Sequence, residues 1–138
     1  MFDANEVING LYGFVYDENG KQMQETKAFE ANVDYDKEDV LQAGKLMKGH
    51  KVIAASGAGT ITAHKIDSRL QRKAADNPHA KYNFSAKLKD PTSKGEEYIM
   101  FIGVSFDSAQ LMSFELGELG EIEMDFTFDD YKYLKSIN

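Results

Sequence analysis

The sequence predicts a mostly β fold, an antiparallel β-sandwich or half-barrel with one short helix laid beside it. Several segments alternate apolar and polar residues with the period of two that a half-buried strand requires. Only one short segment, ending before Pro78, has helical spacing. The 138 residues fit a single domain covering 1–138, because no internal repeat, low-complexity tract or linker divides them.

The strands are predicted in order from these alternating patterns. Aromatic residues alternate at Tyr12, Phe14 and Tyr16, and the Asn19-Gly20 pair that follows is typical of a hairpin turn. Residues 98–106 are apolar on both faces, which predicts a central strand covered on both sides. Small residues over 54–59 predict close approach by another backbone. Further strands are expected at 29–35, 52–64, 82–88, 111–116 and 122–128.

One helix is predicted within 66–76. It should begin near Ser68, with Asp67 or Ser68 as its N-cap, and Pro78 should end it, because proline disfavours helix in the residue before it. The spacing i, i+4, i+8 predicts a narrow apolar stripe formed by Ile66, Leu70 and Ala74.

Residues 36–51 lose the strand alternation. They are polar and contain two glycines, so the sequence predicts an irregular connection of 16 residues. Connections of that length are uncommon in compact domains and are usually functional when ordered.

The charge is unevenly distributed. The net charge is −7, but residues 43–73 carry seven basic residues and one acidic residue, whereas residues 1–42 and 91–138 carry ten acidic and three basic residues each. If the fold keeps these patches on different faces, copies can attract head to tail; otherwise the opposite charges neutralise each other within the fold. The acidic total argues against non-specific binding to nucleic acid.

The composition and the motifs exclude most catalytic chemistry. The absence of Cys removes disulfides, Cys-based zinc sites and thiol nucleophiles. The three histidines stand apart, so no metal site is predicted. Residues 44–51 have the glycine spacing of a phosphate loop, but His50 stands where the lysine is required and Lys51 where a hydroxyl is required. No enzyme and no cofactor are predicted. No stretch is long enough to span a membrane, and the N-terminus lacks a signal-peptide pattern.

Several runs resemble a known family in the same order along nearly the whole chain. They are residues 27–35, 44–51, 57–60, 104–109 and 126–131. The chain is similar to the tail tube proteins of contractile phage tails, including those of PBSX-type prophages, and to the tube subunits of R-type bacteriocins such as diffocin. The acidic segment 115–125 and the basic helix depart from the pattern, so charge-based contacts transfer least safely.

The resemblance implies a structural subunit. Members form hexameric rings whose sheets join edge to edge into a ring-shaped barrel around a lumen, and the rings stack inside a contractile sheath. The implied partners are further copies of the chain, the sheath protein, the baseplate and tail terminator proteins, and the tape measure protein in the lumen. DNA passes through the lumen only in a phage, and no membrane is involved in the free form. Assembly is expected in the bacterial cytoplasm, followed by release as a phage tail or bacteriocin particle.

Three candidate surfaces follow from the resemblance and the residues together. The 36–51 connection is expected to reach the next ring, or else to be a mobile surface loop; its candidate contacts are Asp39, Val40, Leu41, Lys45, Leu46, Met47, Lys48 and His50. The basic face of the helix is expected either to contact the sheath or to be merely solvated; it comprises Lys65, Arg69, Arg72 and Lys73. A carboxylate-lined lumen would repel a phosphate backbone; its candidates are Glu123 and Asp125.

Two alternatives remain open at this point. The first is a small monomeric β-sandwich module that binds a peptide or glycan through its seven Tyr and nine Phe residues, although core packing explains most of these aromatic residues better. The second is an enzyme that uses carboxylates alone, for which no convergent cluster is visible. A binding module should stay monomeric at high concentration, whereas a tube protein should polymerise.

Overall fold

The computed structural model describes residues 3–23, 26–66, 68–92 and 94–137. Two short 3₁₀ turns, Ala4–Glu6 and Gly10–Tyr12, precede the first strand. The remaining elements are β1 (Gly13–Tyr16), β2 (Thr26–Val40), β3 (Gly49–His64), α1 (Arg69–Asp76), β4 (Tyr82–Leu88), β5 (Glu97–Phe106), β6 (Glu121–Phe128) and β7 (Asp130–Lys135).

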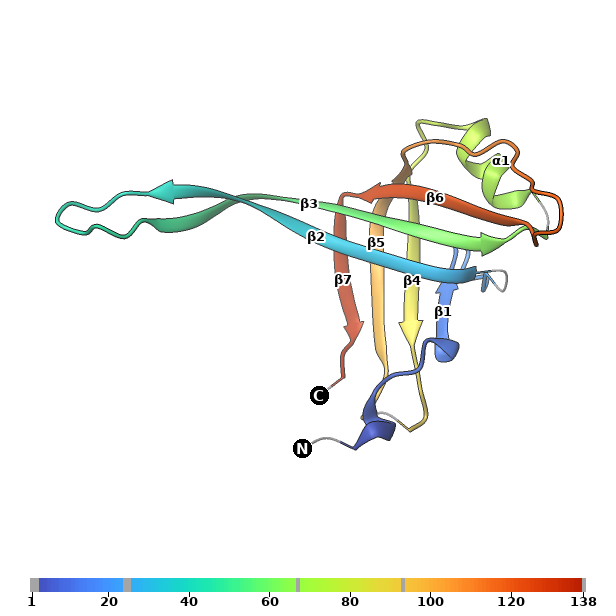
Figure 1. Ribbon diagram of the computed structural model, residues 1–138, viewed down its shortest axis with the longest axis horizontal. Coiled ribbons are helices and arrows are strands. Elements are labelled where there is room, and N and C mark those ends of the chain that lie inside the picture. Colours follow the sequence, from blue (N-terminus) through green and yellow to red (C-terminus); the bar gives the residue numbers. More distant parts are fainter. Residues whose placement is uncertain (1–2, 24–25, 67, 93, 138) are drawn as a thin grey trace.

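The strands form two layers that cross steeply (Figure 1). Strands β1, β4, β5 and β7 make one layer, and β6, β3 and β2 make the other; all the pairs are antiparallel. The two layers are joined by β5, whose last residues Ser105 and Phe106 leave the first layer and pair with β6. The predicted mostly β, antiparallel fold with one short helix is therefore confirmed, and the 98–106 segment is central as expected.

The core lies between the two layers. Its fully buried side chains come from both of them: Phe84 and Val104 from the first, and Ile61, Met124 and Phe126 from the second. Aromatic contacts also cross the gap, with ring centroids of Phe29 and Phe101 5.5 Å apart and those of Phe101 and Phe128 5.1 Å apart. Burying such rings dominates the energetics of small β cores.

Two glycines of β3, Gly57 and Gly59, lie in close contact with aromatic side chains of β6. A Cβ atom on Gly57 would lie 2.3 Å from the ring of its partner Phe128. Close approach by another backbone at 54–59 was predicted from the sequence. It occurs at Gly59, where a Cβ would lie 2.3 Å from the Glu30 carbonyl oxygen, whereas at Gly57 the group that approaches is an aromatic side chain. Glycine is required there for space, because any side chain would overlap the ring.

Strands β2 and β3 continue far beyond the body as a two-stranded hairpin (Figure 1). Lys37 pairs with Val52 and Val40 pairs with Gly49, so the irregular part is limited to residues 41–48. The prediction of an irregular connection over 36–51 was therefore wrong at both ends. An apolar–polar alternation arises where one face of a strand is buried. The projecting part of the β2–β3 hairpin is exposed on both faces, so its strands show no such alternation.

The helix is shorter than the predicted 66–76. It begins at Arg69, and the Ser68 side chain makes no capping hydrogen bond, while Asp67 lies outside the described residues. Two members of the predicted stripe, Leu70 and Ala74, are buried against the body, but Ile66 lies before the helix and is 74% exposed.

The segment 111–116 was predicted as a strand, and this prediction was wrong. Residues 107–120 form the connection between β5 and β6 and contain no strand. The alternation of Met112, Phe114 and Leu116 imitates a half-buried strand, but all three side chains are exposed in the subunit. The pattern therefore does not report burial within this chain.

Candidate assembly surfaces

The hairpin tip, defined here as residues 39–51, presents apolar and cationic side chains together. Its exposed apolar residues are Val40, Leu41, Leu46 and Met47, with Leu46 98% exposed. All the candidate inter-ring residues lie on it: Asp39 and Val40 end β2, His50 is the second residue of β3, and the loop between the strands carries Leu41, Lys45, Leu46, Met47 and Lys48. The structure thus brings these residues into one projecting surface.

One carboxylate holds the base of the hairpin tip. Asp39 Oδ2 lies 3.5 Å from Lys48 Nζ, and Asp39 Oδ1 lies 3.4 Å from Nε2 of its cross-strand partner His50. Each of these side chains is more than half exposed, so the pairs contribute little stability. Within the described residues, Lys45 and Lys51 make no ion pair, which leaves both cations available to another surface.

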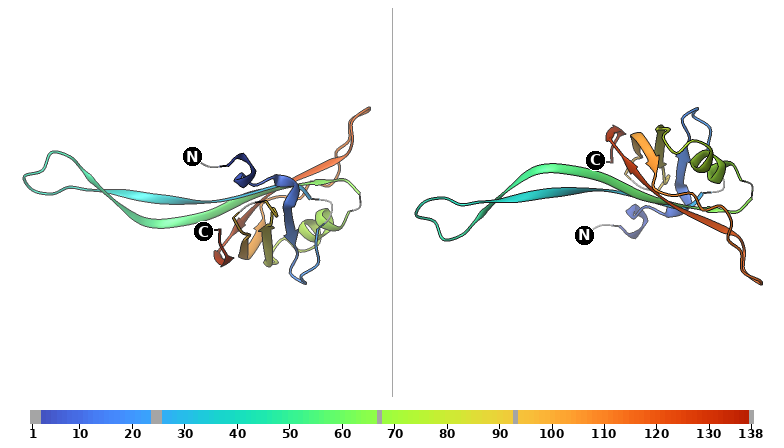
Figure 2. Two further views of the ribbon diagram at one scale, coloured as in Figure 1. Left: turned by 90° about the horizontal axis from the view of Figure 1, so that it is seen from below. Right: turned by 90° about the horizontal axis from the view of Figure 1, so that it is seen from above.

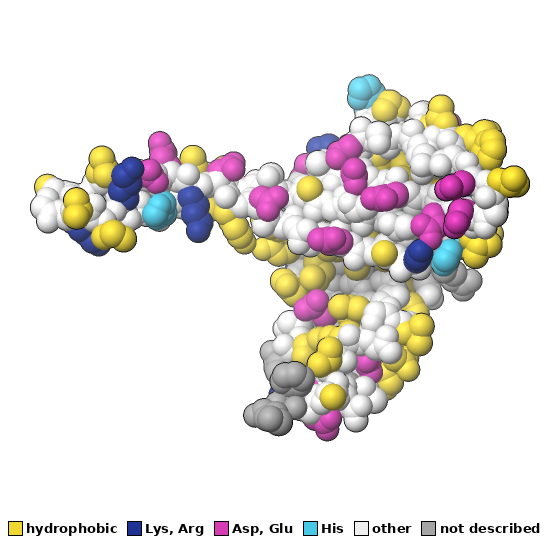
Figure 3. Space-filling model, in the orientation of Figure 1, with side chains coloured by type: hydrophobic (Ala, Val, Ile, Leu, Met, Phe, Trp, Pro, Cys, Tyr) yellow, Lys and Arg dark blue, Asp and Glu magenta, His cyan; other side chains and the backbone are white. Residues whose placement is uncertain are grey.

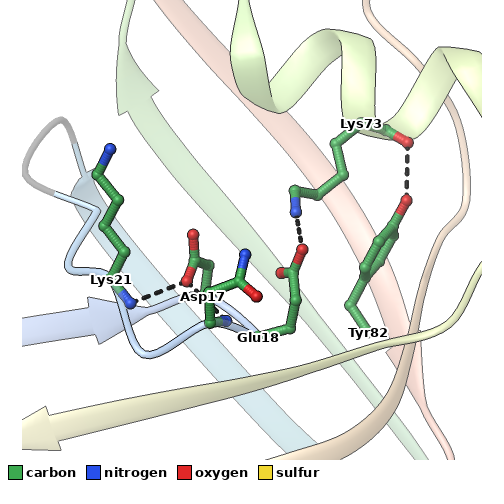
Figure 4. A network of polar contacts seen from close by, with 6 residues as sticks. Asp17, Glu18, Lys21, Lys73 and Tyr82 are labelled. Carbon is green, nitrogen blue, oxygen red and sulfur yellow. Dashed lines mark hydrogen bonds and ion pairs between the residues drawn. The ribbon is translucent and has the colours of Figure 1, made fainter.

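The basic helix face is less available than the sequence indicated. Figure 4 shows Lys73 directed toward Glu18, with which it forms an ion pair. Lys73 Nζ also lies 4.7 Å from the ring centroid of Tyr82, whose hydroxyl donates a 3.1 Å hydrogen bond to the Lys73 carbonyl. Lys73 therefore ties α1 to β4 and to the 17–20 turn, where the Asp17 carboxylate accepts from backbone N–H groups.

The other three basic residues differ in their surroundings. Lys65 donates to Gln71 and Ser68, so it braces the segment entering the helix. Arg72 Nε lies 3.4 Å from Asp76 Oδ2 in an exposed i, i+4 pair. Arg69 and Arg72 are the exposed basic residues of α1 itself. Any outward charge from this helix is therefore carried mainly by two arginines.

The outer face of β6 and its neighbours is acidic. The burial of β6 alternates without exception, so Glu121, Glu123 and Asp125 point away from the core. Asp125 Oδ1 accepts a 2.8 Å hydrogen bond from Thr60 on β3, and Lys27 pairs with Glu121, lowering the pKa of that carboxyl through its hydrogen bond and its charge. Figure 3 shows acidic side chains gathered on this side of the body. Glu123 and Asp125, predicted as a pair, do lie on one face.

The backbone edges of β2 and β7 are open. Among the described strands, β2 pairs only with β3, and β7 pairs only with β5. Strand β7 is exposed along its whole length and carries Tyr131, Tyr133 and Leu134. Unpaired edges of this kind are templates for strands from other chains.

The described residues contain no cluster of metal-ligating side chains. Among them, no group of three or more His, Cys, Asp or Glu side chains could hold a metal ion. No helix within the described ranges is long and apolar enough to cross a membrane. Four of the aromatic residues that a small binding module could use are buried in the core: Phe84, Phe101, Phe126 and Phe128.

Comparisons with known proteins agree with this picture. The family model described as "Phage tail tube protein" matches residues 1–135. The Bacillus subtilis (strain 168) protein "Phage-like element PBSX protein XkdM" is 35% identical over 136 residues, which cover 93% of this chain and 90% of that protein.

Solved structures share the fold at low identity. A chain of an extracellular contractile injection system, solved as a PVC sheath-tube complex in the extended state, has a TM-score of 0.73 at 9% identity, covering 99% of this chain and 100% of its own. A chain of the anti-feeding prophage tube-terminating cap has a TM-score of 0.76 at 8% identity, covering 99% and 96%. With the family model spanning nearly all of its length, this chain belongs to the phage tail tube protein family.

Proposed function

We propose that this subunit builds the inner tube of a contractile tail, of either a phage or an R-type bacteriocin, as hexameric rings stacked around a lumen inside a sheath. The observation that carries the proposal is the β2–β3 hairpin. It extends beyond the body, is exposed on both faces and ends in apolar side chains that nothing in the described subunit covers. Soluble monomers rarely expose large contiguous apolar patches, so an uncovered apolar surface of this kind indicates a contact with another chain.

Ring closure is supported by the open edges. In a ring, the open edge of β2 on one subunit would pair with a backbone edge of its neighbour, which extends the second layer from subunit to subunit. The outer face of that layer, which carries Glu123 and Asp125, would then line the bore. A carboxylate-lined bore repels the phosphate backbone of passing DNA and so reduces sticking.

Partners follow from this arrangement. Solved relatives include tubes bound to a sheath, and terminator, cap and baseplate particles. We infer equivalent partners for this chain, with a tape measure protein in the lumen and with DNA only in a phage. The subunit acts structurally and without catalysis, assembling in the bacterial cytoplasm before release of the particle. Arg69 and Arg72 are the helix residues proposed to face the sheath.

The experiment is electron microscopy of the purified chain, concentrated stepwise, with and without a baseplate to start growth. Rings and hollow rods are expected. A variant in which residues 41–48 are replaced by Asn-Gly keeps a hairpin turn and should form rings that do not stack. A chain that stays monomeric at every concentration, even with a baseplate, contradicts the proposal.

The sheath contact has its own test. Reversing both charges, with Arg69→Glu and Arg72→Glu, should leave the bare tube intact and weaken sheath loading, because both side chains are exposed. The matched control is Lys89→Glu, an exposed lysine that directly follows the last residue of β4. Normal sheath loading by the arginine variant would remove α1 from the sheath contact.

A further inference from the structure

The β5–β6 connection, residues 107–120, carries an apolar surface that the subunit does not use. Its five large apolar side chains are each at least 75% exposed: Leu111, Met112, Phe114, Leu116 and Leu119. Five such residues within nine positions form a patch, whereas scattered single exposed residues are ordinary. A surface of this kind requires a partner.

The connection is anchored at both ends rather than loosely attached. Near its start, the buried side chain of Gln71 on α1 donates to the carbonyl oxygens of Gln110 at 2.6 Å and Leu111 at 3.2 Å. At its end, the carbonyl oxygen of Gly120 accepts a 2.8 Å hydrogen bond from Lys65 N. A buried amide committed to this purpose holds the exposed part in a defined place beside α1.

The connection and the hairpin tip lie at opposite ends of the same layer. Strand β3 begins at Gly49, within the hairpin tip, and ends at His64, whose partner Glu121 directly follows the connection. The 16 residues of β3 span roughly 50 Å at the usual rise per strand residue. Figure 1 shows the hairpin at one end of the molecule and the connection at the other, and Figure 2 shows the connection standing out from the body.

The two surfaces are complementary in charge. The hairpin tip, residues 39–51, contains three lysines and one acid, Asp39, which pairs with Lys48, whereas residues 107–120 contain three acids and no base. Within the described residues, Glu115 and Glu118 make no ion pair, as is also true of Lys45 and Lys51. Each surface is apolar, and the two carry net charges of opposite sign, which suits a contact between them.

We propose that the β5–β6 connection is the receptor for the hairpin tip of another copy of this chain, in the adjacent ring. The inference rests on the proposed tube function and names the surface that the hairpin reaches. Because the two surfaces differ and lie at opposite ends, the contact is head to tail and does not close on itself. Every ring then presents hairpin tips on one side and receptors on the other, which gives the stack a direction.

Disulfide trapping tests the contact directly, since the chain has no Cys. The variant Met47→Cys with Phe114→Cys places one thiol on each surface. After tubes have formed under reducing conditions and are then oxidised, a ladder extending beyond dimers is expected on non-reducing gels, because each subunit has two different neighbours. The control is Met47→Cys with Lys89→Cys, which keeps the hairpin thiol but moves its partner to an exposed site off the connection. Tubes that yield no ladder, or equal ladders from both variants, overturn the proposal.

A charge exchange provides the second test. Lys45→Glu with Lys51→Glu, and separately Glu115→Lys with Glu118→Lys, should each raise the concentration needed for tube growth about tenfold. All four changes in one chain should restore most of the loss. If the fourfold variant is no better than the worse half, the connection is not the receptor.

The outcomes separate this inference from the function that it extends. If the unmodified chain forms no tube even on a baseplate, the tube function itself fails. If the unmodified chain forms tubes, the hairpin variant does not, and reversal of Glu115 and Glu118 has no effect, then only the receptor assignment fails.

Discussion

The ring of Phe126 lies against the backbone of its cross-strand partner Gly59, so close that a Cβ on the glycine would be 2.5 Å from the ring and 2.3 Å from the Glu30 carbonyl oxygen. One of these neighbours is backbone, so the site cannot relax by a side-chain rotation alone. The ring also stacks on Phe29, 5.7 Å between centroids, which fixes its position further.

Gly59→Ala should therefore lower the free energy of unfolding by about 2 kcal/mol or more, the usual cost of overpacking a tight core. Urea unfolding of the monomer measures it. Ala58→Ser, on the exposed face of the same strand, is the control and should stay within about 0.5 kcal/mol of the parent. Equal stabilities for the two variants would mean that β3 and β6 are further apart than described.

Asp90 makes the free energy of unfolding depend on pH in the acidic range. This buried carboxylate accepts hydrogen bonds from Thr92 N and Asn9 N at 2.9 Å and from Thr92 Oγ1 at 2.8 Å, and these bonds hold its pKa below the usual value. The unfolded chain then binds the proton more tightly, so this stabilisation is complete above about pH 4 and is lost as pH falls through the lowered folded pKa.

Asp90→Asn should accordingly lower the melting temperature at pH 7 and flatten its fall as the pH drops below about 4. Thr92→Val removes the hydrogen bond from Thr92 Oγ1 and should produce a smaller change in the same direction. Thermal unfolding of both variants and the parent, monitored by circular dichroism at several pH values, measures these differences. An unchanged acid slope in the Asn variant would contradict the role of Asp90.

Lys73 and Arg72 should differ although they are adjacent cations. Lys73 pairs with Glu18 and lies over the Tyr82 ring, with less than a third of its side chain exposed, whereas Arg72 is largely exposed. Lys73→Ala should cost about 1 kcal/mol of unfolding free energy and Arg72→Ala less than about 0.5 kcal/mol. Denaturant unfolding of both variants under identical conditions is the measurement.

The hairpin tip should matter for assembly and not for folding. Leu46 and Met47 are 98% and 75% exposed, so changing both to Ser removes almost no burial within the monomer. The melting temperature of the monomer should stay within about 2 °C, consistent with a change below about 0.5 kcal/mol. Tubes should be absent or short in micrographs. A normal tube length distribution would show that these two apolar side chains are not used.

The acidic face of β6, with Glu123 and Asp125, should affect the passage of DNA through the tube and not the assembly of the tube. Glu123→Gln with Asp125→Asn removes two charges from the exposed side of β6 without altering the buried residues between them. Tubes should form normally, while DNA ejection from a phage particle should slow. Unchanged ejection would count against these residues lining the bore.

Sequence patterns predicted the buried part of the fold well. Strand β6 is the clearest case, because its alternation of Ile122, Met124, Phe126 and Phe128 matches its burial residue by residue. The failures share one physical cause. An alternating apolar pattern is evidence of a strand only where one face of that strand is buried within the same chain. Met112, Phe114 and Leu116 alternate but are exposed in the subunit, so a strand was wrongly predicted there. Residues Asp36–Val40 form a strand exposed on both faces, so they lack the alternation and a loop was wrongly predicted.

The candidate surfaces were predictable to different degrees. The residues proposed for the inter-ring contact could be grouped from the sequence because they are contiguous and because the family resemblance implies a contact there; their contact with the next ring stays a prediction. The engagement of Lys73 with Glu18 was not predictable, since the two residues are separated by 55 positions and meet only through the packing of α1. The anchoring role of Gln71 gave no sequence signal, because a single glutamine in a short helix is ordinary.

The separation of the hairpin tip from the β5–β6 connection has an evolutionary consequence. Residues at opposite ends of a strand as long as β3 cannot touch within one subunit. Paired substitutions between these two regions across related sequences, such as a hairpin lysine lost together with a connection glutamate, would therefore record contacts between molecules. Such pairs would disagree with the distances within one subunit. They would instead supply the contacts needed to position one ring on the next.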